Sequence, residues 1–286
     1  MSQAASTKSN RRWALVTAYI CLLVFAVFFL FPPYYMLITS FKTNEEISAQ
    51  RSIPLLIQEG LTLEHYRKLF FETDFPIFFK NTVIVTVFTV VISMVVSILA
   101  AYSLSRLRFW GATVMATGVF LTYLVPDTLL FIPLFKVVGW LGLLNSKWSL
   151  VVVFPTLAVP FATWIMIGYF ASIPKELDEA ALMDGANYRQ ILTRVFIPVA
   201  LPGLIAATIF AFTVSWAQFL YPLAFTTSTD QLVLPVGIIT SLIKGDVYNW
   251  GQIMTGALLG AAPPLIIYAF LMDYYISGLT AGATKG

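Results

Sequence analysis

The chain has 286 residues, of which 59% are hydrophobic and only 11% are charged, and its formal net charge is +3. Soluble domains carry about a quarter charged residues, so this composition excludes an ordinary soluble protein and favours a membrane protein. The small net charge, without a clustered basic face, also argues against nucleic-acid binding.

Six stretches of the chain contain no Asp, Glu, Lys or Arg, and each is long enough to cross a bilayer as a helix, which takes about 20 apolar residues. They are residues 13–41, 81–105, 109–126, 148–174, 195–229 and 247–272. The stretches lack the period-2 alternation of barrel strands, and backbone groups in lipid must be paired within a segment. We therefore predict an all-α membrane protein with six transmembrane helices.

Basic residues near the helix ends indicate the orientation of the chain. Lys8, Arg11 and Arg12 precede the first stretch, and Arg106 and Arg108 lie in the short turn after the second. Because such residues favour the cytoplasmic side, we expect both termini in the cytoplasm. The first stretch is too long for a signal peptide and lacks a small-residue cleavage site, so we interpret it as a retained helix.

The exterior connections are predicted to hold interfacial structure. In the 42–80 loop, the segment TLEHYRKLF predicts a short amphipathic helix at the membrane surface or against another subunit. The apolar face of that helix would consist of Leu63, Tyr66, Leu69 and Phe70. After the third stretch, Pro126 and Pro133 interrupt the apolar sequence. We expect an irregular connection there, with Trp140 and Trp148 at the depth of the lipid headgroups.

The largest cytoplasmic feature is expected at 171–203, where two short helices joined by a tight turn form a knob (residues 175–198). Pro174 suits a first helical turn, and acidic residues from Glu176 onward complement the positive helix end. Gly185 would end the first helix in a left-handed conformation, and Asn187 would begin the second. Pro198 and Pro202 would then stop the second helix before the fifth membrane helix.

The charges of this knob have two interpretations. They could merely satisfy the helix ends, with each contributing about 0.3–1 kcal/mol. The small residues around the turn favour a docking surface instead, because they allow a partner to approach the backbone closely. These small residues are Ala180, Ala181, Gly185 and Ala186.

The stretch from Glu179 to Pro198 resembles the Glu-Ala-Ala loop of permeases in binding-protein-dependent ABC importers. The matching positions are Glu179, Ala180, Ala181, Asp184, Gly185, Ala186 and Pro198. Leu192, Val195 and Ile197 depart conservatively from the Phe, Ile and Leu that are frequent there. In that family the loop is a coupling helix that docks into a cleft of the ATPase subunit. The resemblance implies that Glu179 meets the ATPase and that Gly185 makes the turn.

Three further stretches resemble the maltose-type permease subunit of carbohydrate importers. They are Thr39-Ser40-Phe41-Lys42, the run WAQFLYPLAFTTS from Trp216, and GLTAGATKG from Gly278. Ala217-Gln218 stand where relatives often have Asn-Glu, and Asp273 and Ser277 stand where basic residues are common. The resemblance spans nearly the whole chain and implies a type I ABC importer transmembrane domain. Its organisation would be a cytoplasmic tail expected to be disordered (1–12), the first transmembrane helix with an exterior loop (13–76), a permease core (77–273) and a cytoplasmic C-terminal tail (274–286).

The function implied by this resemblance is that of a permease subunit which forms half of a translocation pathway in the bacterial or archaeal cytoplasmic membrane. The solute would be an oligosaccharide, disaccharide or polyol. The implied partners are a homologous second permease subunit, two copies of an ABC ATPase subunit and an extracytoplasmic solute-binding protein, all in or at the lipid bilayer. No nucleic acid is expected among them.

No catalytic or metal site is expected in the chain itself. The sequence has no GxxxxGK[ST] phosphate loop, so ATP and Mg would be bound by the partner ATPase subunits, and the chain would hold no cofactor. His65 is the only histidine, and there is no HExxH motif or Cys/His cluster. The lone Cys21 can form no internal disulfide. We therefore interpret the chain as a non-catalytic subunit of an ATP-hydrolysing complex.

Four residues are candidates for contact with a solute. Asp127 beside Pro126 would face protein or water, since an ionisable group in hydrocarbon costs at least ~2.5 kcal/mol, or it would lie at the membrane interface. Tyr123, Trp216 and Gln218 complete the set. The two aromatic rings could stack on the apolar face of a sugar, or they could simply face lipid or the protein core. Three alternatives stay open at this point: the permease of a non-carbohydrate ABC importer, an ion-driven secondary transporter, and an intramembrane enzyme.

Overall fold

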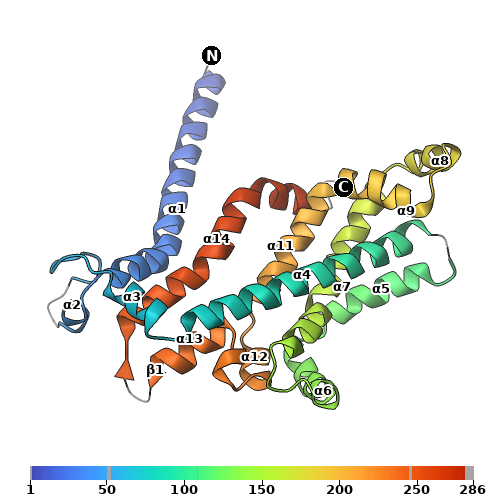
Figure 1. Ribbon diagram of the computed structural model, residues 1–286. Helices are drawn as coiled ribbons and strands as arrows, with labels where there is room; N and C mark the ends of the chain where they lie inside the picture. The colour runs from blue at the N-terminus through green and yellow to red at the C-terminus, as the bar shows by residue number, and fades with distance from the viewer. Residues whose placement is uncertain (1, 50–52, 108, 245–246, 281–286) are drawn as a thin grey trace. The chain divides into compact units, whose positions relative to one another are not determined.

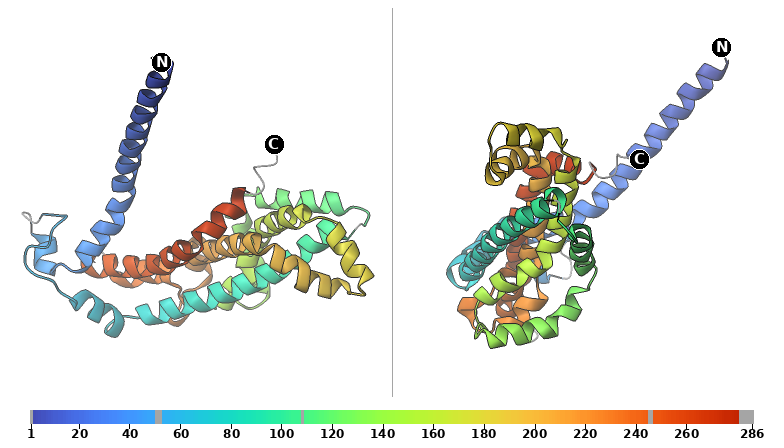
Figure 2. Two further views of the ribbon diagram at one scale, coloured as in Figure 1. Left: turned by 90° about the horizontal axis from the view of Figure 1, so that it is seen from above. Right: turned by 90° about the vertical axis from the view of Figure 1, so that its right-hand side faces the viewer.

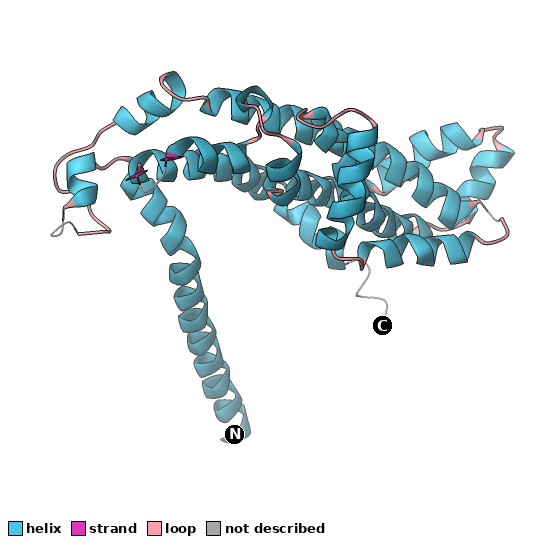
Figure 3. Cartoon of the chain, turned by 90° about the horizontal axis from the view of Figure 1, so that it is seen from below, coloured by secondary structure: helices cyan, strands magenta, loops and turns pink. Residues whose placement is uncertain are grey.

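The computed structural model describes residues 2–49, 53–107, 109–244 and 247–280. Nearly all of these residues are helical. The strands β1 (Ile243–Lys244) and β2 (Val247–Tyr248) pair as a short antiparallel ribbon (Figure 3). The chain divides into two compact units. The first comprises Met1–Thr73 and Ser241–Leu259, and the second comprises Asp74–Thr240 and Gly260–Gly286.

The first unit contains α1 (Ser2–Ser40), α2 (Asn44–Ser48), α3 (Glu64–Phe71) and the beginning of α14 (Trp250–Thr280) (Figure 1). The part of α1 from Trp13 to Ser40 is an apolar candidate span, and no residue of its most apolar 18-residue window is buried by the chain itself. The helix already begins at Ser2, so the disorder expected of residues 1–12 is not observed. The physical reason is that this segment contains no Gly or Pro and is rich in residues that tolerate a helix.

A buried junction follows α1 and includes the predicted Thr39–Lys42 motif. The ammonium of Lys42 lies 3.1 Å from the Glu46 carboxylate, with side-chain exposures of 3% and 1%, and it also donates to the carbonyl of Ile53. Glu46 in turn accepts hydrogen bonds from the backbone N–H groups of Gln58 and Glu59. The charges of this junction are therefore paired and hydrogen-bonded, as buried charges require.

The amphipathic helix predicted in the exterior loop is present as α3, but its buried face differs from the prediction. His65 and Leu69 are buried, whereas Leu63 and Phe70 are exposed. Leu63 lies just before the helix as its N-cap. His65 can be buried because its Nε2 lies 2.8 Å from the carbonyl oxygen of Lys42 in a hydrogen bond.

The second unit is built on α4 (Phe75–Arg106), α7 (Trp148–Ser172) and α11 (Leu201–Ala217), which lie side by side (Figure 2). The face of α4 toward the bundle carries small polar residues, which allow close approach between helices. These buried residues are Thr82, Thr86, Thr89, Ser93 and Ser97. The remaining long helix of this unit is the later part of α14. Residues 281–286, the end of the predicted C-terminal tail (274–286), lie outside the described residues.

Two of the six predicted spans are broken. Four helices, Trp13–Ser40, Phe75–Arg106, Trp148–Ser172 and Trp250–Met272, are long and apolar enough to cross a membrane, and the number rises to six if each of two bent pairs counts as one span. The first pair is α5 (Ala112–Tyr123) with α6 (Asp127–Trp140), which meet at 98°. The second is Tyr188–Val199 with Leu201–Ala217, which meet at 82°.

Proline explains where these breaks lie. Pro126 cannot donate a backbone hydrogen bond and disfavours helix at the residue before it, so α5 ends at Tyr123. The sequence after Pro126 is the helix α6 and not the expected irregular connection, because Pro133 removes only one bond from a helix of 14 residues.

The predicted continuous span 195–229 is likewise wrong, since α11 ends at Ala217 and α12 (Leu220–Phe225) follows. A continuous α11 would need a hydrogen bond from the backbone N–H of residue 222 to the carbonyl of Gln218. Pro222 has no N–H, so this bond cannot form. The segment then proceeds through a 3-10 turn, η2 (Thr229–Gln231), and α13 (Leu234–Leu242).

Candidate functional site

The knob has the local structure predicted for it. Its first helix, α8 (Glu176–Met183), is followed by Gly185 with φ +80°, the left-handed conformation that favours glycine. Asn187 caps α9 (Tyr188–Ile191) through a reciprocal pair of hydrogen bonds: the N–H of Gln190 donates to Asn187 Oδ1 at 2.9 Å, and the N–H of Asn187 donates to Gln190 Oε1 at 2.8 Å. The turn is thus held by local bonds on both sides.

The ends of the knob differ from the prediction. Pro174 lies two residues before α8 instead of in its first turn, because α8 begins at Glu176. After α9 the chain continues as a π-helical turn, η1 (Leu192–Phe196), and as α10 (Ile197–Val199), which includes Pro198. The chain therefore bends at Ala200, and Pro202 takes a position in the first turn of α11, where its missing N–H costs nothing.

The seven residues that match the Glu-Ala-Ala loop divide between two faces. Glu179, Ala180, Asp184, Gly185 and Pro198 are exposed, and Met183 beside them is 88% exposed. Ala181 and Ala186 are half-buried and pack against the hydrophobic cluster below the knob. A Cβ atom added at Gly185 would meet nothing within 4 Å, so the backbone of the turn is open to a partner.

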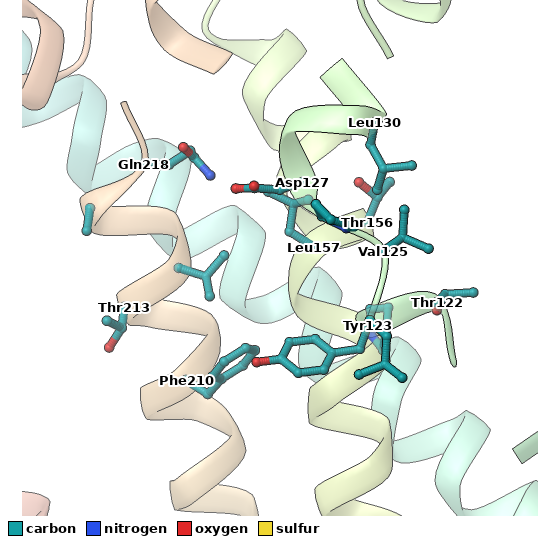
Figure 4. A pocket seen from close by; sticks show the side chains of 15 residues that line it. Thr122, Tyr123, Val125, Asp127, Leu130, Thr156, Leu157, Phe210, Thr213 and Gln218 are labelled. Carbon is teal, nitrogen blue, oxygen red and sulfur yellow. The ribbon is translucent and has the colours of Figure 1, made fainter. Parts of the chain in front are cut away.

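A pocket of about 410 Å³ lies where α5 ends and α6 begins, between that break and the helices α7 and α11 (Figure 4). Asp127 and Gln218 point toward one another at one end of the pocket, and Tyr123 and Phe210 lie at the other (Figure 4). Thr156 and Thr213 also line it, but the Thr156 hydroxyl donates to the carbonyl of Val153, and the Thr213 hydroxyl is hydrogen-bonded to the carbonyl of Ile209 and the hydroxyl of Tyr268. Hydrogen-bonding groups and aromatic surface therefore face the same space.

The aromatic end of the pocket is a packed cluster. The ring of Phe161 stacks on Tyr123 with centroids 4.7 Å apart, and it also contacts Phe210 at 4.3 Å. Tyr123 and Phe210 meet edge to face at 6.2 Å. At the polar end, the Tyr221 hydroxyl donates to the backbone carbonyl of Asp127 at 2.7 Å and thereby fixes the start of α6. Such a combination suits a solute with hydroxyl groups and an apolar ring face.

Three of the four predicted solute-contact residues meet in this pocket, and Trp216 does not. The indole of Trp216 is 7% exposed, donates to the carbonyl of Gly260 at 2.9 Å and borders a separate apolar groove. Thr213 and Ala217, four residues apart, occupy one face of α11, and residue 216 projects from another. The spacing of Phe210, Thr213 and Ala217 was the sequence signal that could have identified this face.

Metal binding finds no support in the described part of the chain, where no three His, Cys, Asp or Glu side chains gather in a way that could hold an ion.

Known proteins resemble this chain over most of its length. A family model described as the binding-protein-dependent transport system inner membrane component matches residues 93–280. The chain is 37% identical to the inner membrane ABC transporter permease protein YcjP of Escherichia coli strain K12, over 97% of this chain and 99% of that one. It is 32% identical to the diacetylchitobiose uptake system permease protein DasC of Streptomyces coelicolor, over 97% and 98% of the two chains.

The fold is similar to that of a solved bacterial ABC transporter involved in the import of the acidic polysaccharide alginate. The TM-score is 0.82 at 25% identity, and the match covers 93% of this chain and 98% of that one. The comparison confirms the predicted fold class, and the family leaves the intramembrane-enzyme alternative without support. This chain, a multi-pass membrane protein, therefore belongs to the family of binding-protein-dependent transport system inner membrane components.

Proposed function

We propose that this chain is the permease subunit of an ATP-driven importer and forms half of the translocation pathway for a carbohydrate. The observation that carries the proposal is the pocket at the α5–α6 break, in which Asp127 and Gln218 share one space with an aromatic cluster. Relatives named for diacetylchitobiose and for trehalose and maltose support a saccharide as the solute class. An oligosaccharide, disaccharide or polyol fits this surface.

The helices that line the pocket also lead to the knob. On α7, Thr156 and Leu157 line the pocket, and the helix ends at Ser172, four residues before α8 begins. On the other side, α11 begins directly after the knob and reaches the pocket at Ala217 (Figure 1). The helices α7 and α11 are therefore unbroken between their knob-side ends and the pocket, so a displacement of the knob has a short route to both pocket walls. We propose alternating access in which separate ATPase subunits move the knob.

The partners in this proposal are a homologous second permease subunit, two ATPase subunits that bind ATP and Mg, and a binding protein that delivers the solute. A solved relative at 16% identity is an alginate transporter in complex with its oligosaccharide-bound periplasmic protein, and it shares the fold of this chain with a TM-score of 0.68. We place the complex in the bacterial or archaeal cytoplasmic membrane, with both termini and the knob on the cytoplasmic side, as the basic residues beside the helices favour.

The test is ATP-dependent uptake and solute-stimulated ATP hydrolysis by the reconstituted complex. Glu179→Lys and Gly185→Pro change the exposed face and the left-handed turn of the knob, so we expect both to abolish uptake and to release the ATPase. Glu45→Lys, at an exposed position of α2, makes the same charge change and should preserve ATPase retention. Unchanged uptake without a bound ATPase would instead establish an ion-driven transporter.

A further inference from the structure

Arg106, the last residue of α4, contacts three other elements with one side chain that is 4% exposed. Its Nη2 donates to the backbone carbonyls of Phe170 and Ile173 at the end of α7. Its Nη1 lies 3.4 Å from Oδ2 of Asp178 in the first turn of α8. Its guanidinium carbon lies 4.7 Å from the ring centroid of Phe196 in η1.

The contacts suit the chemistry of a guanidinium group. The last carbonyls of a helix carry partial negative charge, so a cation at the end of α7 is favourable. The planar fork of Arg presents several N–H groups in fixed directions and can also lie flat on an aromatic face. A lysine ammonium is a point charge and cannot satisfy two carbonyls, a carboxylate and a ring in this geometry.

A buried aromatic triangle lies below this arginine. The ring of Phe196 meets Tyr102 at 5.2 Å and Phe170 at 5.3 Å, both edge to face, so α4, α7 and η1 share one contact. Ala181 and Ala186, on the inner face of the knob, pack against the same cluster. The knob thus rests on a surface that belongs jointly to α4 and α7.

The charged centre is not fully hydrogen-bonded. Within the described part of the chain, Nε of Arg106 and Oδ1 of Asp178 are buried and have no hydrogen-bond partner. A buried ion pair with incomplete bonding is a poor source of stability, because desolvation of the charges is not fully offset. The value of this arrangement therefore lies in the fixed geometry that it imposes on the four elements.

We propose that Arg106 is a positioning residue that joins the knob rigidly to α4 and α7, so that movement of the knob moves the pocket helices with it. This inference rests on the proposed function, because it concerns how the force of the ATPase reaches the pocket. Without Arg106 the knob would still dock, but it would move relative to α7. Uptake would then become uncoupled from ATP hydrolysis.

The experiment compares the wild-type complex in lipid with Arg106→Gln and Arg106→Lys variants in this chain. Two quantities are measured: solute taken up per ATP hydrolysed, and hydrogen exchange of the α8 amides. We expect Arg106→Gln to retain the ATPase. Solute uptake per ATP should fall about tenfold, and hydrogen exchange of the α8 amides should accelerate about tenfold, because the loss of one charged contact has an effect of about this size. Arg106→Lys should give intermediate values. Arg67→Gln is the matched control, since Arg67 is exposed on α3, outside both the knob and the pocket.

The proposal is overturned if Arg106→Gln keeps both its solute uptake per ATP and its α8 amide exchange rate within about twofold of the wild-type values. If Arg106→Gln does not assemble, Arg106→Lys decides by the same criterion. The double variant Arg106→Gln/Asp178→Asn also removes the carboxylate that the single variant leaves without its cation, and we expect it to assemble with low uptake per ATP. If this double variant takes up as much solute per ATP as the wild type, the defect of Arg106→Gln came only from the uncompensated charge of Asp178. That outcome would also refute the proposal. If the wild-type complex shows no ATP-dependent uptake, the proposed function fails, while α8 exchange still tests the contact of Arg106 with the knob.

Discussion

Asp127 is the one charged side chain among the described residues that line the pocket, and this fact sets the sign of the local field. A carboxylate repels an anionic solute and accepts hydrogen bonds from hydroxyl groups, so this half of the pathway should favour neutral saccharides. The relation to an importer of an acidic polysaccharide is therefore one of fold, and the solute preference is expected to differ.

We predict that Asp127→Asn makes an anionic sugar, such as a uronate oligosaccharide, about tenfold more effective as a competitor relative to a neutral sugar. This change corresponds to about 1.4 kcal/mol. The measurement is uptake of the labelled neutral solute in the presence of each competitor. Gln218→Glu places a second carboxylate in the pocket and should shift the ratio the opposite way. Equal competition before and after the Asp127 substitution would exclude an electrostatic role.

At the scale of elements, α11 lies tightly against α7 at its first turn. A Cβ atom added at Gly203 would lie 2.2 Å from the ring of Tyr169, a distance that requires displacement of one of the helices or of the ring. Gly203 therefore permits the close contact between the two helices that join the knob to the pocket.

We predict that Gly203→Ala destabilises the protein by about 1–3 kcal/mol, the usual cost of overpacking a tight contact. The midpoint of thermal unfolding in the same membrane mimetic measures the effect. The matched control is Gly168→Ala on α7, where an added Cβ would meet nothing within 4 Å and where helix propensity favours alanine. Similar midpoints for the two variants would mean that Tyr169 moves aside freely.

The junction after α1 offers a contrast between a buried and an exposed ion pair. Lys42 and Glu46 are nearly inaccessible, whereas Lys68 and Glu64 form a pair of the same spacing with exposures of 32% and 54%. Burial acts to raise the pKa of Glu46, but hydrogen bonds from Glu59, Lys42 and Gln58 lower it by more, so the net pKa lies below its usual value. The stability from Glu46 is therefore present above the usual carboxyl pKa and is lost as the pH falls through the lowered value.

We predict that Lys42→Met costs about 3–5 kcal/mol, because it leaves a buried carboxylate without its cation, whereas Lys68→Met costs at most about 1 kcal/mol. Proteolysis of the 42–63 segment in the intact protein measures the difference. In the wild type, cleavage should increase as the pH falls through the lowered pKa of Glu46. Glu46→Gln should remove that pH dependence, and its persistence in this variant would assign the acid sensitivity to another group.

On the scale of the whole molecule, the arrangement of the second unit separates the knob from the pocket without interrupting the helices between them. Along α7, one hydrophobic cluster takes residues 150–154, the pocket takes 156–160, and a second cluster takes 162–173 and continues under the knob. The pocket therefore lies where the packed core is interrupted. In the proposed transport cycle, the wall of the pocket must be able to open there, and the knob on the ATPase side must be connected rigidly to the helices.

The sequence by itself determined the helical class, the unbroken spans and the local structure of the knob. Charge-free stretches at 81–105 and 148–174 became α4 and α7, because twenty or more apolar residues in lipid have no alternative to a helix. Gly185 and Asn187 were predictable because a left-handed turn and a helix cap depend only on neighbouring residues.

Only the tertiary structure decided that Thr156 and Thr213 line the same pocket as Asp127, and that Trp216 lies outside it. The same is true of Arg106, which the sequence marked only as a basic residue beside a helix. Its partner Asp178 lies 72 positions away in the chain. No local pattern encodes such a contact, because it arises only when the packing of α4 against α7 brings the two helix ends together.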